Sequence, residues 1–193
     1  MQNQTPNRLR QFVQTLTAAL PAGAERATYP DALVPALKRL VAHDDWLADD
    51  FARPGADTYR QYLLYCDPLE RFSVVSFVWA AGQKTPIHDH TVWGAIGQLR
   101  GTEVSTPYVR GDNDLLHPQT KQTATAGDVI AFTPAGGDIH QVVNPGPETA
   151  VSIHVYGANI GRVTRSTFDA ASGTASPFIS GYSSDVIPNI WSE

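Results

Sequence analysis

From residue 59 onward the chain is built of short runs rich in valine, isoleucine, tyrosine and phenylalanine, with turn residues about every ten positions. Turns such as Gly111-Asp112-Asn113 and Asn144-Pro145-Gly146-Pro147 separate the runs, and no helical pattern lies between them. Nine such runs favour an antiparallel sandwich or barrel and exclude a parallel α/β sheet. The predicted strands are 59–66, 71–79, 92–99, 103–109, 121–125, 129–132, 141–143, 150–156 and 162–168.

Helical patterns precede the strands. The first is followed by Pro21 and is formed by Leu9, Phe12, Val13, Leu16 and Leu20. The second begins near Asp31 and Pro35 and is formed by Leu33, Leu37, Leu40 and Val41. We expect a short third turn through Trp46 and Leu47, capped by Asp44 or Asp45. The apolar faces predict that these helices cover one face of a sheet.

The length of 193 residues predicts a single domain. Residues 1–50 form its helical N-terminal segment, 59–168 its β-barrel and 169–193 a C-terminal extension. After residue 172 serine, glycine and proline are frequent. This composition predicts an extended wrap over the barrel or partial disorder.

Charge and cysteine content exclude several classes of function. Lysine and arginine total 14 against 19 acidic residues, for a net charge of −5, so no basic patch is available for nucleic acid. No stretch is long and apolar enough to cross a membrane, and no polybasic run addresses its surface. The single cysteine, Cys66, excludes an internal disulfide or a multi-thiolate metal site, and is expected to be a buried apolar residue. We expect a soluble protein of a reducing compartment, most simply the cytoplasm.

Three histidines form a candidate metal site. His88 and His90 are separated by one residue, so on a strand their side chains point to the same face. His140 follows about fifty residues later, directly after a glycine-rich turn. A same-face pair with a third imidazole predicts one bound cation, whereas an isolated histidine is more often only a satisfied polar group.

A second polar group lies on the predicted strand 150–156. Ser152, His154 and Tyr156 alternate along it and share one face, while Ile153 and Val155 face apolar packing. The three polar side chains predict a hydrogen-bonded relay whose phenol ends near the metal. The alternative is a core tyrosine whose hydroxyl is satisfied by the histidine. A serine nucleophile is a poor alternative, because the face carries no acid and no nucleophile elbow is present.

The spacing of these histidines resembles the two cupin motifs. The first consists of Gly82, five residues, His88-Asp89-His90 and later Gly101. The second is resembled by Gly127, Pro134, Gly136, His140 and Asn144, with two single-residue insertions. The resemblance implies a cupin double-stranded β-helix barrel, with the N-terminal helices packed on it and a metal at its mouth.

One position departs from the first motif. Where cupins commonly carry a glutamate, with three residues intervening after His90, this chain has Gly94. Without that carboxylate a divalent ion keeps its full charge, which favours anionic ligands, and soft thiolate donors suit iron. Three neutral imidazoles on one face also leave coordination positions open for a substrate and dioxygen together.

Two features together resemble the cysteine dioxygenase type I family of thiol dioxygenases. One is the set of three histidines without the glutamate, His88, His90 and His140; the other is the row Ser152, His154 and Tyr156. The resemblance implies Fe(II) as the cofactor and a small thiol and O₂ as the substrates. Both oxygen atoms of O₂ are added to the thiol sulfur, and the product is a sulfinate. Tyr156, oriented by His154 and Ser152, is expected to hydrogen-bond bound substrate or oxygen. Related enzymes cross-link this tyrosine to a cysteine near the metal. Gly94 has no sulfur, so Tyr156 should remain an unmodified phenol.

The expected substrate depends on Gln61. Cysteine-specific members hold the substrate carboxylate with an arginine at this position, and glutamine cannot form that charged pair. Arg60 is adjacent but points to the other face of a strand. The pattern resembles bacterial 3-mercaptopropionate dioxygenases, in which a later arginine meets the carboxylate. Arg165 is the first candidate and Arg162 the reserve. We expect 3-mercaptopropionate to be preferred, with cysteine a slower substrate.

Two alternatives stay open. The three histidines also fit another metal-dependent cupin enzyme, such as an isomerase or a different dioxygenase. A cupin that binds a small ligand without catalysis is the other alternative. Trp93, beside Gly94, is predicted to form a wall of the pocket and not to react.

Overall fold

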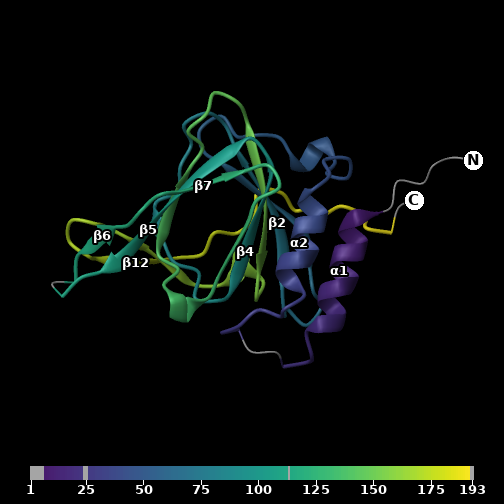
Figure 1. Ribbon diagram of the computed structural model, residues 1–193, viewed down its shortest axis with the longest axis horizontal. Coiled ribbons are helices and arrows are strands. Elements are labelled where there is room, and N and C mark those ends of the chain that lie inside the picture. Colours follow the sequence, from purple (N-terminus) through teal and green to yellow (C-terminus); the bar gives the residue numbers. More distant parts are fainter. Residues whose placement is uncertain (1–6, 24–25, 113, 192–193) are drawn as a thin grey trace, which may run out of the picture.

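The computed structural model describes residues 7–23, 26–112 and 114–191 of the chain (Figure 1). Within these ranges two α-helices come first, α1 (Arg8–Ala19) and α2 (Leu33–Val41), and twelve strands follow. The strands are β1 (Arg60–Cys66), β2 (Ser73–Trp79), β3 (Ile87–His88), β4 (Gly94–Arg100), β5 (Thr102–Arg110), β6 (Leu116–Pro118), β7 (Gln122–Thr125), β8 (Val129–Phe132), β9 (His140–Val143), β10 (Ala150–Tyr156), β11 (Arg165–Phe168) and β12 (Ala175–Phe178). None of the helices in the described ranges has the length and hydropathy needed to cross a bilayer.

Both predicted helices are present. Helix α1 begins at Asn7, whose side-chain oxygen accepts a hydrogen bond from the backbone N–H of Arg10 at 2.9 Å. It ends before Pro21, and its buried side chains recur at helical spacing as Leu9, Phe12, Val13 and Leu16. The apolar face predicted from the sequence is therefore the face that packs inward.

The predicted third turn through Trp46 is wrong. Asp44 and Asp45 cap no turn there, because their carboxylates form ion pairs with Arg100 and Arg8, each at 2.6 Å. The short 3₁₀ turn lies slightly later, at Asp49–Phe51. Burial of the Phe51 side chain fixes it to the sheet.

The strand order defines a double-stranded β-helix. One sheet has the order β1-β2-β10-β4-β8, and the other β12-β11-β3-β9-β5-β6, with β7 also paired to β5. Four strands, β1, β6, β11 and β12, are additions to the barrel. When the remaining eight are renumbered 1 to 8 in chain order, β2-β10-β4-β8 becomes 1-8-3-6 and β3-β9-β5-β7 becomes 2-7-4-5. This order is the double Greek key of a jelly roll, the architecture that cupins share. The predicted mainly β fold class is confirmed.

The two helices cover the outer face of the first sheet, as predicted. Figure 1 shows α1 and α2 side by side against β4 and β2. Helix α2 lies close to β4 at Gly97, where a β-carbon would approach the side chains of Val41 and Leu37 within 2.8 and 3.0 Å. Because Gly97 has no side chain, helix α2 packs directly against the backbone of β4. The opposite face of this sheet is left to line the barrel interior.

Three short strands were not predicted: β3, β6 and β12. The segment after residue 172 forms an extended wrap, because β12 pairs with β11. Beyond β12 the chain crosses to β1, where the backbone N–H of Ser183 donates to the carbonyl of Gln61 at 2.8 Å. The C-terminal segment therefore borders the end of the barrel that contains the three histidines.

Candidate metal centre and pocket

The structure brings His88, His90 and His140 together. His88 on β3 pairs directly with His140 on β9, and His90 lies two residues beyond the end of β3. One nitrogen from each ring lies within 4.8 Å of the corresponding nitrogens of the other two. All three side chains come from the second sheet and its β3–β4 connection, and they form a cluster that could hold one metal ion.

His90 is not on a strand, which corrects the alternation argument. Its backbone N–H donates to the Asp138 carboxylate at 2.7 Å, and the N–H of Thr91 donates to the same oxygen at 3.1 Å. Thr91 has a φ of 61°, in the left-handed region that tight turns use. Asp138 therefore holds the turn that brings His90 beside His88, and the sequence pattern did not indicate this role.

Hydrogen bonds fix the orientation of two of the rings. Nδ1 of His88 lies 3.1 Å from the carbonyl oxygen of Pro86. A carbonyl can only accept, so Nδ1 carries the proton and Nε2 keeps its lone pair. Nδ1 of His140 lies 3.0 Å from the hydroxyl of Ser105. Nδ1 of His90 is buried without a hydrogen-bond partner, 3.6 Å from Asp138 Oδ2.

Burial keeps the three imidazoles neutral. It lowers the pKa of His88 to about 4, and it lowers the pKa values of His90 and His140 well below their usual value. Neutral imidazoles offer lone pairs at neutral pH, which is the state that a metal cation binds. Three neutral, converging nitrogens therefore fit a divalent transition metal.

The place of the usual cupin glutamate is filled by an aromatic ring. Gly94 on β4 pairs with Tyr156 on one side and Phe132 on the other. A β-carbon at position 94 would overlap the Phe132 ring, which itself lies 4.7 Å from the ring of His90. The cluster found in the described ranges consists of the three histidines. The space that a side chain at position 94 would need is thus occupied by the ring of Phe132.

The predicted hydrogen-bonded row is present on β10. The Ser152 hydroxyl lies 2.8 Å from His154 Nε2, and His154 Nδ1 lies 2.8 Å from the Tyr156 hydroxyl. Burial lowers the pKa of His154 to about 3 and raises that of Tyr156. Ile153 and Val155 pack into the core beneath the helices, as alternation predicts. The catalytic role of the row stays a prediction.

One cavity of about 230 Å³ joins these groups. The three histidines, His154 and Tyr156 line it on one side, and the other lining residues are Tyr59, Gln61, Phe77, Trp79, Thr85, Pro86, Val142, Arg165, Thr167, Phe178 and Ser180. The volume is below the usual range for drug-sized ligands, so the cavity suits a molecule of a few heavy atoms. Trp93 is not among the lining residues and is buried in the core under the helices, so its predicted place in the pocket wall is wrong.

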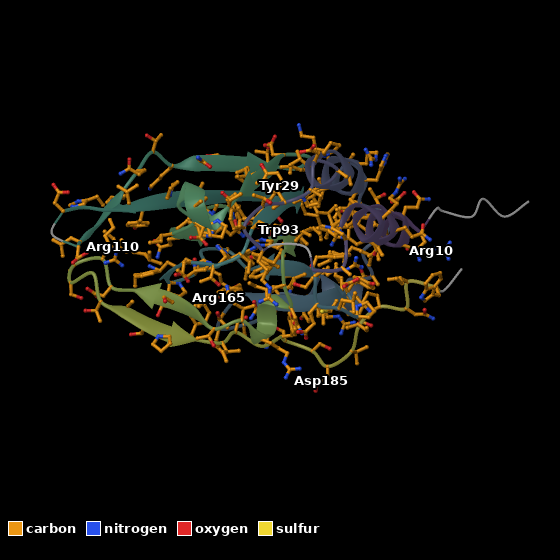
Figure 2. The ribbon with its side chains drawn as sticks, turned by 90° about the horizontal axis from the view of Figure 1, so that it is seen from below. Arg10, Tyr29, Trp93, Arg110, Arg165 and Asp185 are labelled. Atoms are coloured by element: carbon orange, nitrogen blue, oxygen red, sulfur yellow. The ribbon has the colours of Figure 1, made fainter. Side chains whose placement is uncertain are left out.

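Arg165 is the charged group of this cavity. Its side chain is only 5% exposed; in Figure 2 it lies near the middle of the view, whereas Arg110 lies at one end. One terminal nitrogen donates to the Ser180 hydroxyl at 2.8 Å, and Nε has no hydrogen-bond partner. Among the described residues no carboxylate lies within ion-pair distance. A buried cation without an anion is costly, so the site is arranged for an anionic ligand.

Three further residues singled out in the sequence are Arg162, Gln61 and Cys66, and only Gln61 lines the cavity. Arg162, the reserve candidate, is exposed on a 3₁₀ turn and does not line the cavity. Gln61 does line it, but its amide nitrogen donates to the carbonyls of Ser180 and Gly181, at 3.3 and 3.1 Å. Gln61 therefore holds the C-terminal segment against the cavity. Cys66 is only partly buried, which corrects its prediction, and burial raises its pKa to about 11.

No family model matches the chain. Among solved structures it is similar to an uncharacterized conserved protein with a double-stranded β-helix domain from Klebsiella pneumoniae, at 19% identity over 61% of this chain and 93% of that chain, with a TM-score of 0.44. A cupin superfamily protein from Desulfitobacterium hafniense aligns at 14% identity over 61% of this chain and 94% of the other, with a TM-score of 0.46. An oxalate oxidase aligns at 21% identity over 46% of this chain and 42% of its own, with a TM-score of 0.36.

The strand order and the histidine cluster together define the class of protein. The order 1-8-3-6 and 2-7-4-5 is that of a jelly roll, or double-stranded β-helix, the architecture found in cupins. The three converging imidazoles give this barrel a candidate metal centre. The chain therefore has a cupin-type double-stranded β-helix fold with a candidate metal site.

Proposed function

We propose that the protein is a thiol dioxygenase that oxidises a small thiol carboxylate with O₂ to the sulfinic acid at a three-histidine Fe(II) site. We take 3-mercaptopropionate as the preferred substrate and cysteine as a slower one. The observation that carries the proposal is a single small cavity lined by three neutral imidazoles, a phenol and an unpaired arginine. Both oxygen atoms of O₂ are added to sulfur, which loses four electrons while O₂ gains four.

The residues divide the work between the two ends of the substrate. Arg165 would bind the carboxylate through its free N–H donors, in a buried position where a charge-assisted hydrogen bond is strong. A substrate bound in this way would have its thiol toward His88, His90 and His140, which line the same cavity. Fe(II), when bound, would hold sulfur as a thiolate and supply the redox chemistry that O₂ requires. The Tyr156 hydroxyl, held by His154, would hydrogen-bond the reacting groups.

The cavity also supports the choice of substrate. Its lining residues include no aspartate or glutamate that could pair with the ammonium group of cysteine. A buried ammonium without a partner loses hydration that the protein does not replace. 3-Mercaptopropionate carries the same thiol and carboxylate without that group, so its binding has no such cost.

The test is steady-state O₂ uptake by protein loaded anaerobically with Fe(II). We expect kcat/KM for 3-mercaptopropionate to exceed that for cysteine by about tenfold or more, the effect of one poorly solvated charge. One O₂ should be consumed per thiol, and mass spectrometry should find a product that has gained two oxygen atoms. A higher value for cysteine would refute the substrate assignment. Bound metal without thiol-dependent O₂ uptake would instead support another cupin enzyme or a ligand-binding cupin.

The Tyr156→Phe variant separates chemistry from packing. It keeps the ring and removes only the hydroxyl, so the free energy of unfolding should fall by about 1–2 kcal/mol, the cost of one buried hydrogen bond. If the phenol assists the reaction, kcat with 3-mercaptopropionate should fall by about 100-fold, as for a lost proton donor. O₂ uptake and thermal unfolding measure the two effects. Equal kcat values in the two proteins would assign Tyr156 to packing alone.

A further inference from the structure

A buried carboxyl lies at the end of the β10 row that is remote from the cavity. Glu103 on β5 is 4% exposed, and Gln98 Nε2 donates to its Oε1 at 3.3 Å. The Ser152 hydroxyl and the Trp79 indole nitrogen also lie within hydrogen-bonding reach of the carboxyl. Gln98 is itself anchored, because its Nε2 also donates to the Arg100 carbonyl at 2.9 Å. None of the described partners of this carboxyl is a cation.

Hydrogen bonds connect Tyr156, His154 and Ser152 in one line that starts at the cavity, and Glu103 lies within hydrogen-bonding reach of the Ser152 end of this line. We propose that Glu103 is a positioning residue whose protonation state sets the direction of every hydrogen bond in this line, and thereby decides whether the Tyr156 hydroxyl donates into the cavity or accepts from it. The use of this switch in catalysis rests on the thiol dioxygenase proposal. The switch itself does not.

When Glu103 is ionised, its carboxylate can only accept, so the Ser152 hydroxyl donates to it. Ser152 Oγ then accepts from Trp79, at 3.4 Å, and from Nε2–H of His154, at 2.8 Å. With its proton on Nε2, neutral His154 accepts at Nδ1 from the Tyr156 hydroxyl. The phenol oxygen then offers only lone pairs to the cavity.

When Glu103 is protonated, each bond reverses. The carboxyl O–H donates to Ser152, and the Ser152 hydroxyl donates to Nε2 of His154. The proton of His154 then lies on Nδ1, which donates to the Tyr156 oxygen at 2.8 Å. The phenol O–H is thereby free to donate to a ligand in the cavity. Both arrangements satisfy all members of the row, so neither requires a change of backbone.

The surroundings allow this carboxyl to change state near neutrality. Burial raises the pKa of Glu103 to about 7, and the bonds from Ser152 and Gln98 lower it by less. From β10 Ser152 faces it; farther along the same row His154 stays neutral because burial lowers its pKa to about 3, and burial raises the pKa of Tyr156. From β2 and β4 the neutral Trp79 and Gln98 face it, and on β7 it pairs with Ala124.

The direct test is the tautomer of His154, measured by ¹⁵N NMR on the full chain before iron is added. Between about pH 5.5 and about pH 8.5 the proton should move from Nδ1 to Nε2 as Glu103 ionises. Glutamine does not ionise, and with its amide oxygen accepting from Gln98 its N–H faces Ser152, so in Glu103→Gln the His154 Nδ1–H should persist across the range. Loss of signals in His154→Gln assigns the resonances, and exposed Glu148→Gln is the matched control.

One tautomer throughout in the wild type, or the same switch in Glu103→Gln, would overturn the proposal, whatever the enzyme assays show. With Fe(II) and 3-mercaptopropionate, kcat of the wild type should fall about tenfold per pH unit above pH 7, as the donor form of the phenol is lost. Glu103→Gln should lack this alkaline decline. Tautomer switching without any O₂ uptake would remove the dioxygenase proposal and leave the role of Glu103 intact.

Discussion

The His140→Ala protein is expected to retain little iron after anaerobic loading and desalting, while keeping its fold. Three imidazoles form the candidate site, and His140 pairs directly with His88 across β3 and β9. Removing one of three ligands should weaken binding by more than the about 10–100-fold that follows loss of a supporting hydrogen bond. Iron content by elemental analysis measures the effect, and O₂ uptake should fall with it.

The controls for this variant test its specificity. His117→Ala changes an exposed histidine on β6 and should leave iron content unchanged. His140 is partly exposed near the end of the barrel, and its ring contacts the Ser105 hydroxyl, so its loss should leave the circular dichroism spectrum intact. Full iron occupancy in folded His140→Ala would exclude His140 as a ligand and would remove the three-histidine site.

The Arg165→Ala protein is expected to lose about 100-fold in kcat/KM for 3-mercaptopropionate, because a buried charged hydrogen bond contributes about 3 kcal/mol. The guanidinium has a free Nε and no described carboxylate partner, so the substrate carboxylate would be its anion. Removing an unpaired buried cation should not lower the melting temperature. Arg165→Lys should recover only part of the loss, since lysine cannot form the planar two-point contact.

Two comparisons show whether the effect depends on the carboxylate. Arg162→Ala removes an exposed arginine three residues earlier and should keep wild-type kcat/KM. With 3-mercaptopropan-1-ol, which lacks the carboxylate, wild type and Arg165→Ala should turn over at similar low rates. An unchanged kcat/KM for 3-mercaptopropionate in Arg165→Ala would remove this residue from the substrate site.

Local periodicity correctly predicted those elements whose bounds and buried faces follow from their own residue pattern. The strands 129–132 and 150–156 agree with β8 and β10 in both bounds. Alternation along β10 predicted that Ser152, His154 and Tyr156 share a face, because burial of Ile153 and Val155 fixes the register. Alternation also predicted that His88 and His90 lie together, which is correct, but it assumed that both are on a strand, and His90 is not.

Long-range contacts account for what the sequence could not show. His90 is placed by Asp138, which lies 48 residues away. The sequence ranked Arg165 before Arg162, but it could not show that Ser180 and Phe178 enclose Arg165 at the end of the barrel. Glu103 carries no local signal either. A single acid on a strand usually faces water, and only the paired sheets show that this one is enclosed.

The C-terminal segment also has a consequence for the order in which the site assembles. Phe178 and Ser180, which line the cavity beside Arg165, are synthesised after all three histidines and after β10. A growing chain therefore contains its three candidate metal ligands and its polar row before the last wall of the cavity exists. Binding of a metal ion by the three histidines and closure of the cavity would thus be separate events in time, because β12 and the residues after it complete the cavity last.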